Sequence, residues 1–315
     1  MSNGETGSNH EIPYFRVGLT VTVGLLAFGF APILVRLAED THPIKLATLR
    51  TLFAALLLLP LWIKKHVKDR QTGQVDTPGR RIQWLRVAAG VALGVHFTFW
   101  ISSLYFTSVA SASVLVTIHP VMLILIERLF FQKRFPGSVW TGVILAFSGS
   151  VLLGYFDSSI VQPHPNPLLG NTLAFTAAAL FVIYFLIGQN VRQTTGWIDY
   201  VFPVYSYAAL TCVVISIIFG LNPLDASAKG LLLGFLLAFG PQILGHGSMN
   251  YAVKYISPTI LATTILAEPV LGSLGALFLF EEWPPWLSIT AMALIIFGVM
   301  LSWMHKIRRQ NKKGG

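Results

Sequence analysis

The stretch between Arg86 and Glu127 contains no Asp, Glu, Lys or Arg, and this feature most constrains the fold. One crossing of the ~30 Å hydrocarbon core of a bilayer takes ~20 apolar residues, so the stretch is long enough for two helices. Charge-free stretches also occupy 17–35 and 158–191. With 54% hydrophobic and only 11% charged residues, the chain is predicted to be an all-α integral membrane protein.

Apolar stretches and the polar, Pro or Gly residues between them predict ten transmembrane helices. Thr107-Ser108 is the expected break in the long central stretch, with a very short turn joining two antiparallel helices. The ten predicted helices lie near 15–36, 43–63, 84–106, 110–131, 138–156, 168–190, 199–220, 229–252, 258–280 and 286–305.

The basic residues predict the orientation. The formal net charge is +9, but all except four of the 22 lysines and arginines fall on one side of the predicted bundle. The exceptions are Arg36, Lys45 and Lys229 on the other side, and Arg50 within a helix. Under the positive-inside rule both termini are cytoplasmic, in a multi-pass protein of the plasma (inner) membrane. The loop charges fit contact with the lipid bilayer rather than binding of nucleic acid.

The chain also repeats itself. A shift of 149 residues, the separation of Pro120 from Pro269, superposes further identical pairs such as Phe131 with Phe280. Each half, 15–156 and 168–305, is predicted to hold five helices. Because five is odd, the second half enters the bilayer from the opposite side, which makes the halves inverted repeats. Such repeats expose one midplane site to either face in turn.

Two segments carry a resemblance to a known family: 96-HFTFWISSLYFTSVASASVLVTIHPV-121 and 246-HGSMNYAVKYISPTILATTILAEPVLGSLGALFLFEE-282. With Arg50 and Gly170-Asn171, they make the chain resemble the EamA-type members of the drug/metabolite transporter superfamily. The resemblance covers nearly all of 15–305. It implies a ten-helix carrier with a central cavity, commonly an exporter of small metabolites or amino acids, and it names no substrate.

Glu268 directly precedes Pro269, about eleven residues into a predicted helix and therefore ~16 Å deep. An ionisable group at that depth usually faces a polar interior, which makes Glu268 a candidate for substrate binding or proton coupling. Alternatively, a protonated carboxyl bonds a backbone carbonyl freed by the proline. His119 is the equivalent of Glu268 under the repeat and is the second proton-coupling candidate, with a core hydrogen bond as its alternative.

Two further pairs of polar or aromatic residues are four apart on helix faces: His96 with Trp100, and His246 with Asn250. A one-residue slip in the loops aligns the pairs across the repeat, so all four are predicted to line the cavity. The alternative is interhelical hydrogen bonding that holds the bundle together.

Arg50 lies ~10 Å below the outer end of its helix. It either snorkels to the surface, which is the simpler expectation, or acts inside as a counter-charge for an anionic substrate group. Glu127 and Arg128 are expected at one membrane interface, and Glu281 with Glu282 at the other.

Nucleotide-binding, metalloprotease and hydrolase motifs are absent from the sequence, and Cys212 is the single cysteine. No cofactor, metal or enzymatic activity is therefore expected. The sequence favours a secondary transporter of a small-molecule substrate, with direction, proton coupling and a homodimeric assembly left open. The competing hypothesis is an intramembrane enzyme or lipid-handling protein that uses Glu268 and the histidines as acid and base. Inverted repeats favour the carrier.

Overall fold

The computed structural model describes residues 14–73, 78–107, 109–157, 165–280, 283 and 285–311. This part of the chain is helical, without strands, and contains ten helical spans long and apolar enough to cross a membrane. The helices are α1 Tyr14–Gly29, α2 Ala31–Leu37, α3 Pro43–Gln71, α4 Arg80–Phe106, α5 Val109–Val116, α6 His119–Leu129, α7 Gly137–Asp157, α8 Pro167–Arg192, α9 Trp197–Ile218, α10 Ala228–Leu237, the π-helix η1 Ala238–His246, α11 Gly247–Ala252, α12 Pro258–Ile265, α13 Glu268–Phe280 and α14 Trp286–Asn311.

The ten predicted spans are confirmed, but four of them are not continuous α-helices. The first span divides into α1 and α2, the fourth into α5 and α6, and the ninth into α12 and α13, each with a proline just inside its second helix. Proline lacks an amide hydrogen and clashes with the preceding turn, so a helix ends before it. The eighth span is interrupted by η1, which contains Pro241. Such irregular backbone is tolerated at membrane depth where it lines a cavity.

The repeat relates two of these breaks residue by residue. In the fourth span the first helix ends at Val116 and the second begins at His119. Adding 149 gives 265 and 268, and the ninth span indeed ends one helix at Ile265 and begins the next at Glu268. The two halves are thus inverted five-helix repeats with the same local backbone.

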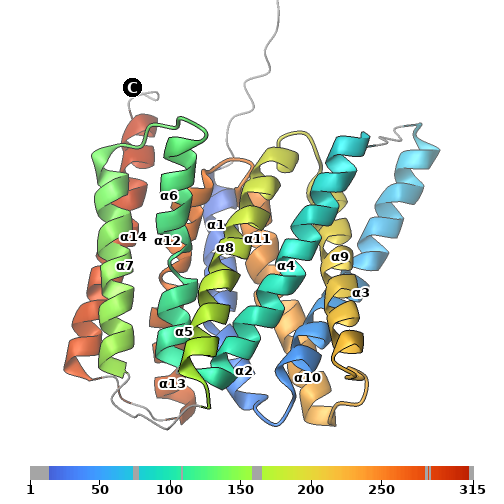
Figure 1. The fold of residues 1–315 in the computed structure, drawn as a ribbon. Helices are drawn as coiled ribbons and strands as arrows, with labels where there is room; N and C mark the ends of the chain where they lie inside the picture. The colour runs from blue at the N-terminus through green and yellow to red at the C-terminus, as the bar shows by residue number, and fades with distance from the viewer. Residues whose placement is uncertain are drawn as a thin grey trace, which may run out of the picture.

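Small residues bring the spans into close contact. A Cβ added to Gly298 of α14 would lie 2.5 Å from the amide nitrogen of Ala146 in α7. One added to Gly94 of α4 would lie 2.8 Å from the carbonyl oxygen of Ala208 in α9. Figure 1 shows α7 beside α14 at one side of the bundle and α4 near α9 toward the other. These glycines allow backbone contact that side chains would prevent.

The outer surface of the bundle is apolar. Phe278, Trp283 and Trp286 are each at least 80% exposed, whereas Arg50 and Glu127 are buried. This inversion of the usual soluble pattern places lipid around the bundle, with aromatic residues suited to the membrane interface. The first helix begins and the last one ends at the same end of the bundle, called the terminal end below (Figure 1).

Candidate functional site in a central cavity

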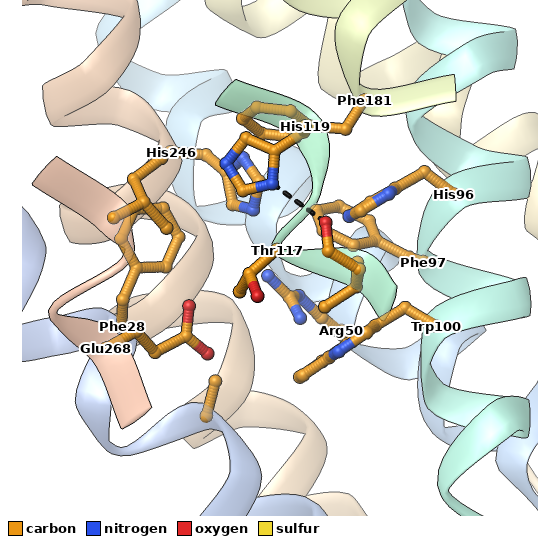
Figure 2. A pocket seen from close by; sticks show the side chains of 13 residues that line it. Phe28, Arg50, His96, Phe97, Trp100, Thr117, His119, Phe181, His246 and Glu268 are labelled. Atoms are coloured by element: carbon orange, nitrogen blue, oxygen red, sulfur yellow. Dashed lines mark hydrogen bonds between the residues drawn. The ribbon is translucent and has the colours of Figure 1, made fainter. Parts of the chain in front are cut away.

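A small cavity of about 50 Å³ lies in the middle of the bundle, between the two repeats (Figure 2). Small-molecule pockets usually measure roughly 300–1,000 Å³, so this cavity is contracted and must widen to hold a metabolite. Its lining residues are Phe28, Ala31, Arg50, His96, Phe97, Trp100, Val116, Thr117 and His119 from the first repeat, and Phe181, His246, Ile265 and Glu268 from the second.

Glu268 is the first residue of α13, and its carboxyl group faces the cavity (Figure 2). The amide groups at the start of a helix favour a negative charge at this position. No hydrogen bond or ion pair joins Glu268 to another described residue, so the bond to a freed backbone carbonyl that a kink-filling role requires is not found there. The carboxyl group is thus available to a solute or a proton.

His119 occupies the matching place as the first residue of α6. Its Nδ1 lies 2.8 Å from the carbonyl oxygen of Val116, and its ring packs against Phe181 with a centroid distance of 4.6 Å. With Nδ1 donating, the buried Nε2 is an acceptor that has no partner in the described structure. His119 therefore presents one free nitrogen, although it makes no direct hydrogen bond to Glu268.

The expectation that Arg50 snorkels to the surface is wrong. The side chain is 1% exposed and lines the cavity. Its Nε donates to Oε1 of Gln242 at 3.2 Å, and the guanidinium carbon lies 3.8 Å above the centre of the Phe97 ring. Because it is held by a neutral amide and an aromatic face rather than by a carboxylate, Arg50 keeps its positive charge uncompensated by any ion pair with a described residue.

Aromatic rings form most of the remaining wall. The rings of His96 and His246 meet edge to face at 6.3 Å, and His246 contacts Phe28 at 4.9 Å and Phe97 at 5.0 Å. His96 is fixed by a 2.8 Å contact between Nδ1 and the carbonyl oxygen of Ala177. The buried Nδ1 of His246 has no partner among the described residues. Trp100 closes the wall near Arg50 (Figure 2).

Asn250 does not line this cavity, in contrast to the other six predicted site residues. Its Nδ2 donates to the carbonyl oxygen of His246 at 2.8 Å and to the hydroxyl of Tyr184. Arg192 in turn donates from Nε to the Asn250 carbonyl oxygen at 2.9 Å. These contacts correspond to the interhelical hydrogen bonding weighed as the alternative, one turn away from the cavity.

Several lining residues were not predicted. Thr117 lies in the break before His119, and the proline pair that marks the break was the signal that could have found it. Phe28, Phe97 and Phe181 are three of 22 phenylalanines, and nothing in their spacing singles them out. Gln242 does not line the cavity but bonds Arg50 from within η1, and a π-helix has no sequence pattern that separates it from an α-helix.

Glu127 was expected at the membrane interface; it lies near the end of α6, but its side chain faces the interior of the bundle instead of the surface. Its side chain is fully buried and is bonded to Lys133 and Thr259, away from the cavity. Arg128, the next residue, is exposed. Glu281 and Glu282 lie outside the described residues.

Comparison with known proteins identifies the family. The model of the EamA-like transporter family matches residues 17–155 and again 168–304. The chain belongs to this family. It is therefore a transporter, and the double match agrees with the inverted repeat.

Individual relatives are distant. The chain is 22% identical to an S-adenosylmethionine uptake transporter of Rickettsia bellii, over 88% of this chain and 89% of that protein. It is 25% identical to a probable terminal-alkyne amino-acid exporter of Streptantibioticus cattleyicolor, over 61% of this chain and 63% of that protein. A solved crystal structure superposes with a TM-score of 0.73 at 16% identity, covering 91% of this chain and 98% of that one, which shows the fold alone.

Proposed function

We propose that this transporter is a secondary carrier that exports a small zwitterionic metabolite of the amino-acid type in exchange for protons. The observation that carries the proposal is that a basic and an acidic side chain line one cavity. Arg50 and Glu268 both line it, and no ion pair joins them in the described structure. A guanidinium group and a carboxyl group that are not bonded to each other are what a solute with a carboxylate and an ammonium group needs.

The guanidinium of Arg50 suits a carboxylate, because its planar donors can make two parallel hydrogen bonds. Its Nε is already bonded to Gln242, so the terminal nitrogens remain for the solute. Glu268 then accepts from the ammonium group. The aromatic faces of Phe97, Trp100 and Phe181 suit the rest of the solute, whether apolar or cationic.

Alternating access follows from the architecture of the cavity walls. Residues of both repeats form the walls, so tilting one repeat against the other opens the cavity to one face or the other. The contracted volume of about 50 Å³ fits an intermediate between these open forms.

Proton coupling rests on Glu268. An ionised carboxylate binds the ammonium group of the solute, and a proton arriving from the far side neutralises the carboxylate and releases the solute. The site thus carries either a proton or a substrate, which is what an exchanger requires. His119, with its free Nε2, is the second group to which a proton or solute can bond.

The relatives support the class of solute. The printed names of the Rickettsia and Streptantibioticus proteins refer to S-adenosylmethionine and to an amino acid, both of which carry an ammonium and a carboxylate group. One name says uptake and the other says export, so the direction rests on the proton argument alone.

The terminal end is proposed to face the cytoplasm of a cell with an inner membrane, because the lysines and arginines gather there. Reporter domains fused after Lys68 and after Lys313 should both report cytoplasm. A periplasmic signal at either position contradicts this orientation.

The function is tested with purified protein in liposomes. Amino acids are compared with two matched analogues, one lacking the carboxylate and one lacking the amine, with and without an imposed pH gradient. We expect accumulation of zwitterions against their gradient and at least tenfold slower transport of both analogues, since each loses one charged hydrogen bond. Equal transport of all three, or chemical conversion of the solute, contradicts the proposal.

A further inference from the structure

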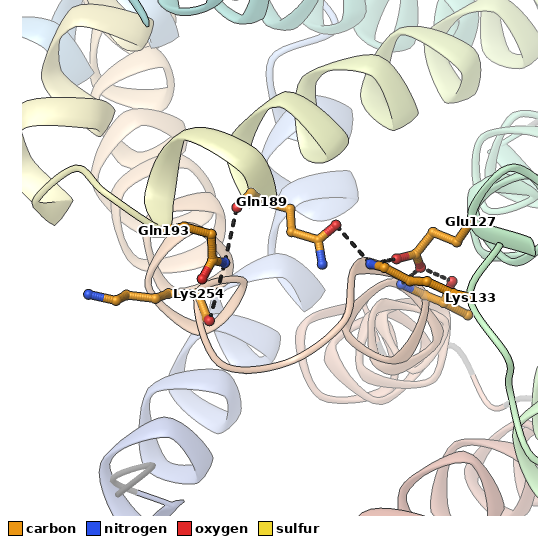
Figure 3. A network of polar contacts seen from close by, with 6 residues as sticks. Glu127, Lys133, Gln189, Gln193 and Lys254 are labelled. Carbon is orange, nitrogen blue, oxygen red and sulfur yellow. Dashed lines mark hydrogen bonds and ion pairs between the residues drawn. The ribbon is translucent and has the colours of Figure 1, made fainter. Parts of the chain in front are cut away.

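We propose that Glu127, Lys133, Gln189 and Thr259 form a latch that closes the cavity toward the terminal end, and that Glu127 is the residue on which the latch depends. Figure 3 shows these contacts together with their continuation to Gln193 and Lys254. The inference rests on the proposed alternating access, and it assigns the residues that control entry from one side.

The Glu127 carboxylate is fully buried, and both of its oxygens are bonded. Oε2 accepts from the amide of Thr259 at 3.2 Å and from its hydroxyl at 2.5 Å. Oε1 accepts from Nζ of Lys133 at 2.5 Å. Glu127 belongs to the first repeat and Thr259 to the second, so a buried charge joins the two halves.

The carboxylate takes the place of a helix cap. The first amides of α12 have no partners within the helix. Ser257 is the N-cap residue of α12, but its side chain makes no capping bond and its Oγ has no partner in the described structure. Glu127 supplies the missing acceptor from the other repeat, and its negative charge suits the start of a helix. Separating the halves therefore leaves the Thr259 amide and Oε2 of Glu127 without each other, while Lys133 of the same repeat stays bonded to Oε1.

Lys133 extends the latch to a third helix. Its Nζ also donates to Oε1 of Gln189 in α8 at 3.1 Å. Its amide donates to the Glu127 carbonyl oxygen at 3.0 Å, which holds the segment after α6 in place. Gln193, one turn beyond Gln189, donates to the carbonyl oxygen of Lys254 at 3.4 Å. The network thus connects the end of α6 to α8 and to the segment leading into α12.

The two helices joined by the latch, α6 and α12, also contribute residues to the cavity wall. The α6 helix begins at His119, which lines the cavity, and carries Glu127 near its other end. In the ninth span, Thr259 is the second residue of α12, and this helix ends at Ile265. Ile265 lines the cavity, as does Glu268, three residues further on. Opening the cavity toward the terminal end requires α6 and α12 to move apart, and this movement breaks the bonds between Glu127 and Thr259.

The sequence does not carry the Glu127–Thr259 pair again at the positions that the repeat makes equivalent. The equivalent of Glu127 is Ala276, from 127 plus 149, and that of Thr259 is Ala110, from 259 minus 149. Alanine has no side-chain donor or acceptor. The bonds between Glu127 and Thr259 thus stabilise closure at the terminal end.

The test measures access to the cavity rather than transport. Cys212, the single cysteine, is replaced by serine, and Val116→Cys places a reporter thiol in the cavity wall. A membrane-impermeant maleimide is added from the terminal end in oriented proteoliposomes. We expect Glu127→Gln to raise the labelling rate about tenfold or more, since a charged hydrogen bond is lost, and Thr259→Val to raise it a few-fold. The matched control, Arg128→Gln, changes the exposed neighbour and should leave the rate unchanged.

Unchanged labelling in both Glu127→Gln and Thr259→Val overturns the latch. If these variants lose thermal stability while labelling stays unchanged, Glu127 only caps α12 and the latch is likewise overturned. If Glu127→Gln does not fold, Thr259→Val and Lys133→Met take its place, and unchanged labelling in both overturns the proposal. The assay contains no solute. If the wild-type protein fails to transport zwitterions, the proposed substrate is contradicted, but the labelling result for the latch is unaffected.

Discussion

The two breaks at His119-Pro120 and Glu268-Pro269 have the same backbone and different chemistry. In each, one helix ends three residues before the titratable side chain and the next helix begins at it. His119 is held by the carbonyl oxygen of Val116, whereas Glu268 has no partner among the described residues. The two breaks thus share one shape, and only the second leaves its ionisable group without a partner among the described residues.

This difference assigns unequal roles to the two breaks. A side chain fixed through one nitrogen can orient a solute with the other, but it is less free to exchange partners. A carboxyl group with no protein partner can bind a proton or an ammonium group at each stage of transport. The break in the second repeat is therefore expected to couple transport to the proton gradient. The following variants test this comparison of the two breaks.

The largest effect is expected from Arg50→Gln, because Arg50 is the positive charge that makes Glu268 part of a zwitterion site. Loss of charged hydrogen bonds worth roughly 1.5–3 kcal/mol should raise the KM for zwitterions about 10- to 100-fold. Arg50→Lys keeps the charge but not the planar donors, so its KM should lie between those of the wild type and of Arg50→Gln. The comparison is made from initial rates in liposomes. An unchanged KM in both variants removes Arg50 from the site.

A smaller effect is expected from His119→Gln. The variant removes the titratable ring but keeps a hydrogen-bonding side chain, so transport should slow about fivefold, corresponding to one neutral hydrogen bond of about 1 kcal/mol. Its dependence on an imposed pH gradient should persist. If that dependence disappears, the first repeat carries the proton and the comparison of the two breaks is reversed.

The smallest effect on transport is expected from Asn250→Leu. Asn250 bonds the carbonyl oxygen of His246 and the hydroxyl of Tyr184 outside the cavity. The variant should lower the free energy of unfolding by about 1–3 kcal/mol, seen as a lower thermal transition, because buried partners are left unpaired. The KM should change less than threefold. A KM increase without a stability change places Asn250 in the binding site instead.

Much of the fold follows from local sequence properties. Apolar stretches and the polar, Pro or Gly residues between them give the ten spans, and the two prolines 149 residues apart point to the repeat. Each span depends on residues close together in the chain. The cavity position of Glu268 and His119 follows from the same prolines, since each residue lies at a break near the middle of its span.

The environments of Arg50 and Glu127 could not be predicted in the same way. Depth along a helix is readable, but the direction of a side chain depends on its neighbours in space. Arg50 turns inward because Gln242, 192 positions away, and Phe97 hold it. Glu127 is buried because the start of α12, 132 positions away, needs an acceptor. Both partners become visible only when the helices are assembled.

The most direct test of the account is transport driven by a pH gradient in wild-type protein and in Glu268→Gln, measured in the same liposomes. The variant keeps the size and hydrogen-bonding capacity of the side chain but cannot titrate. We expect it to lose gradient-driven accumulation of zwitterions while it still exchanges solute at equal pH on the two sides, with a KM raised about tenfold by loss of the charge. Accumulation at the normal rate, with the pH dependence intact, would contradict the role of Glu268 as the exchanging group.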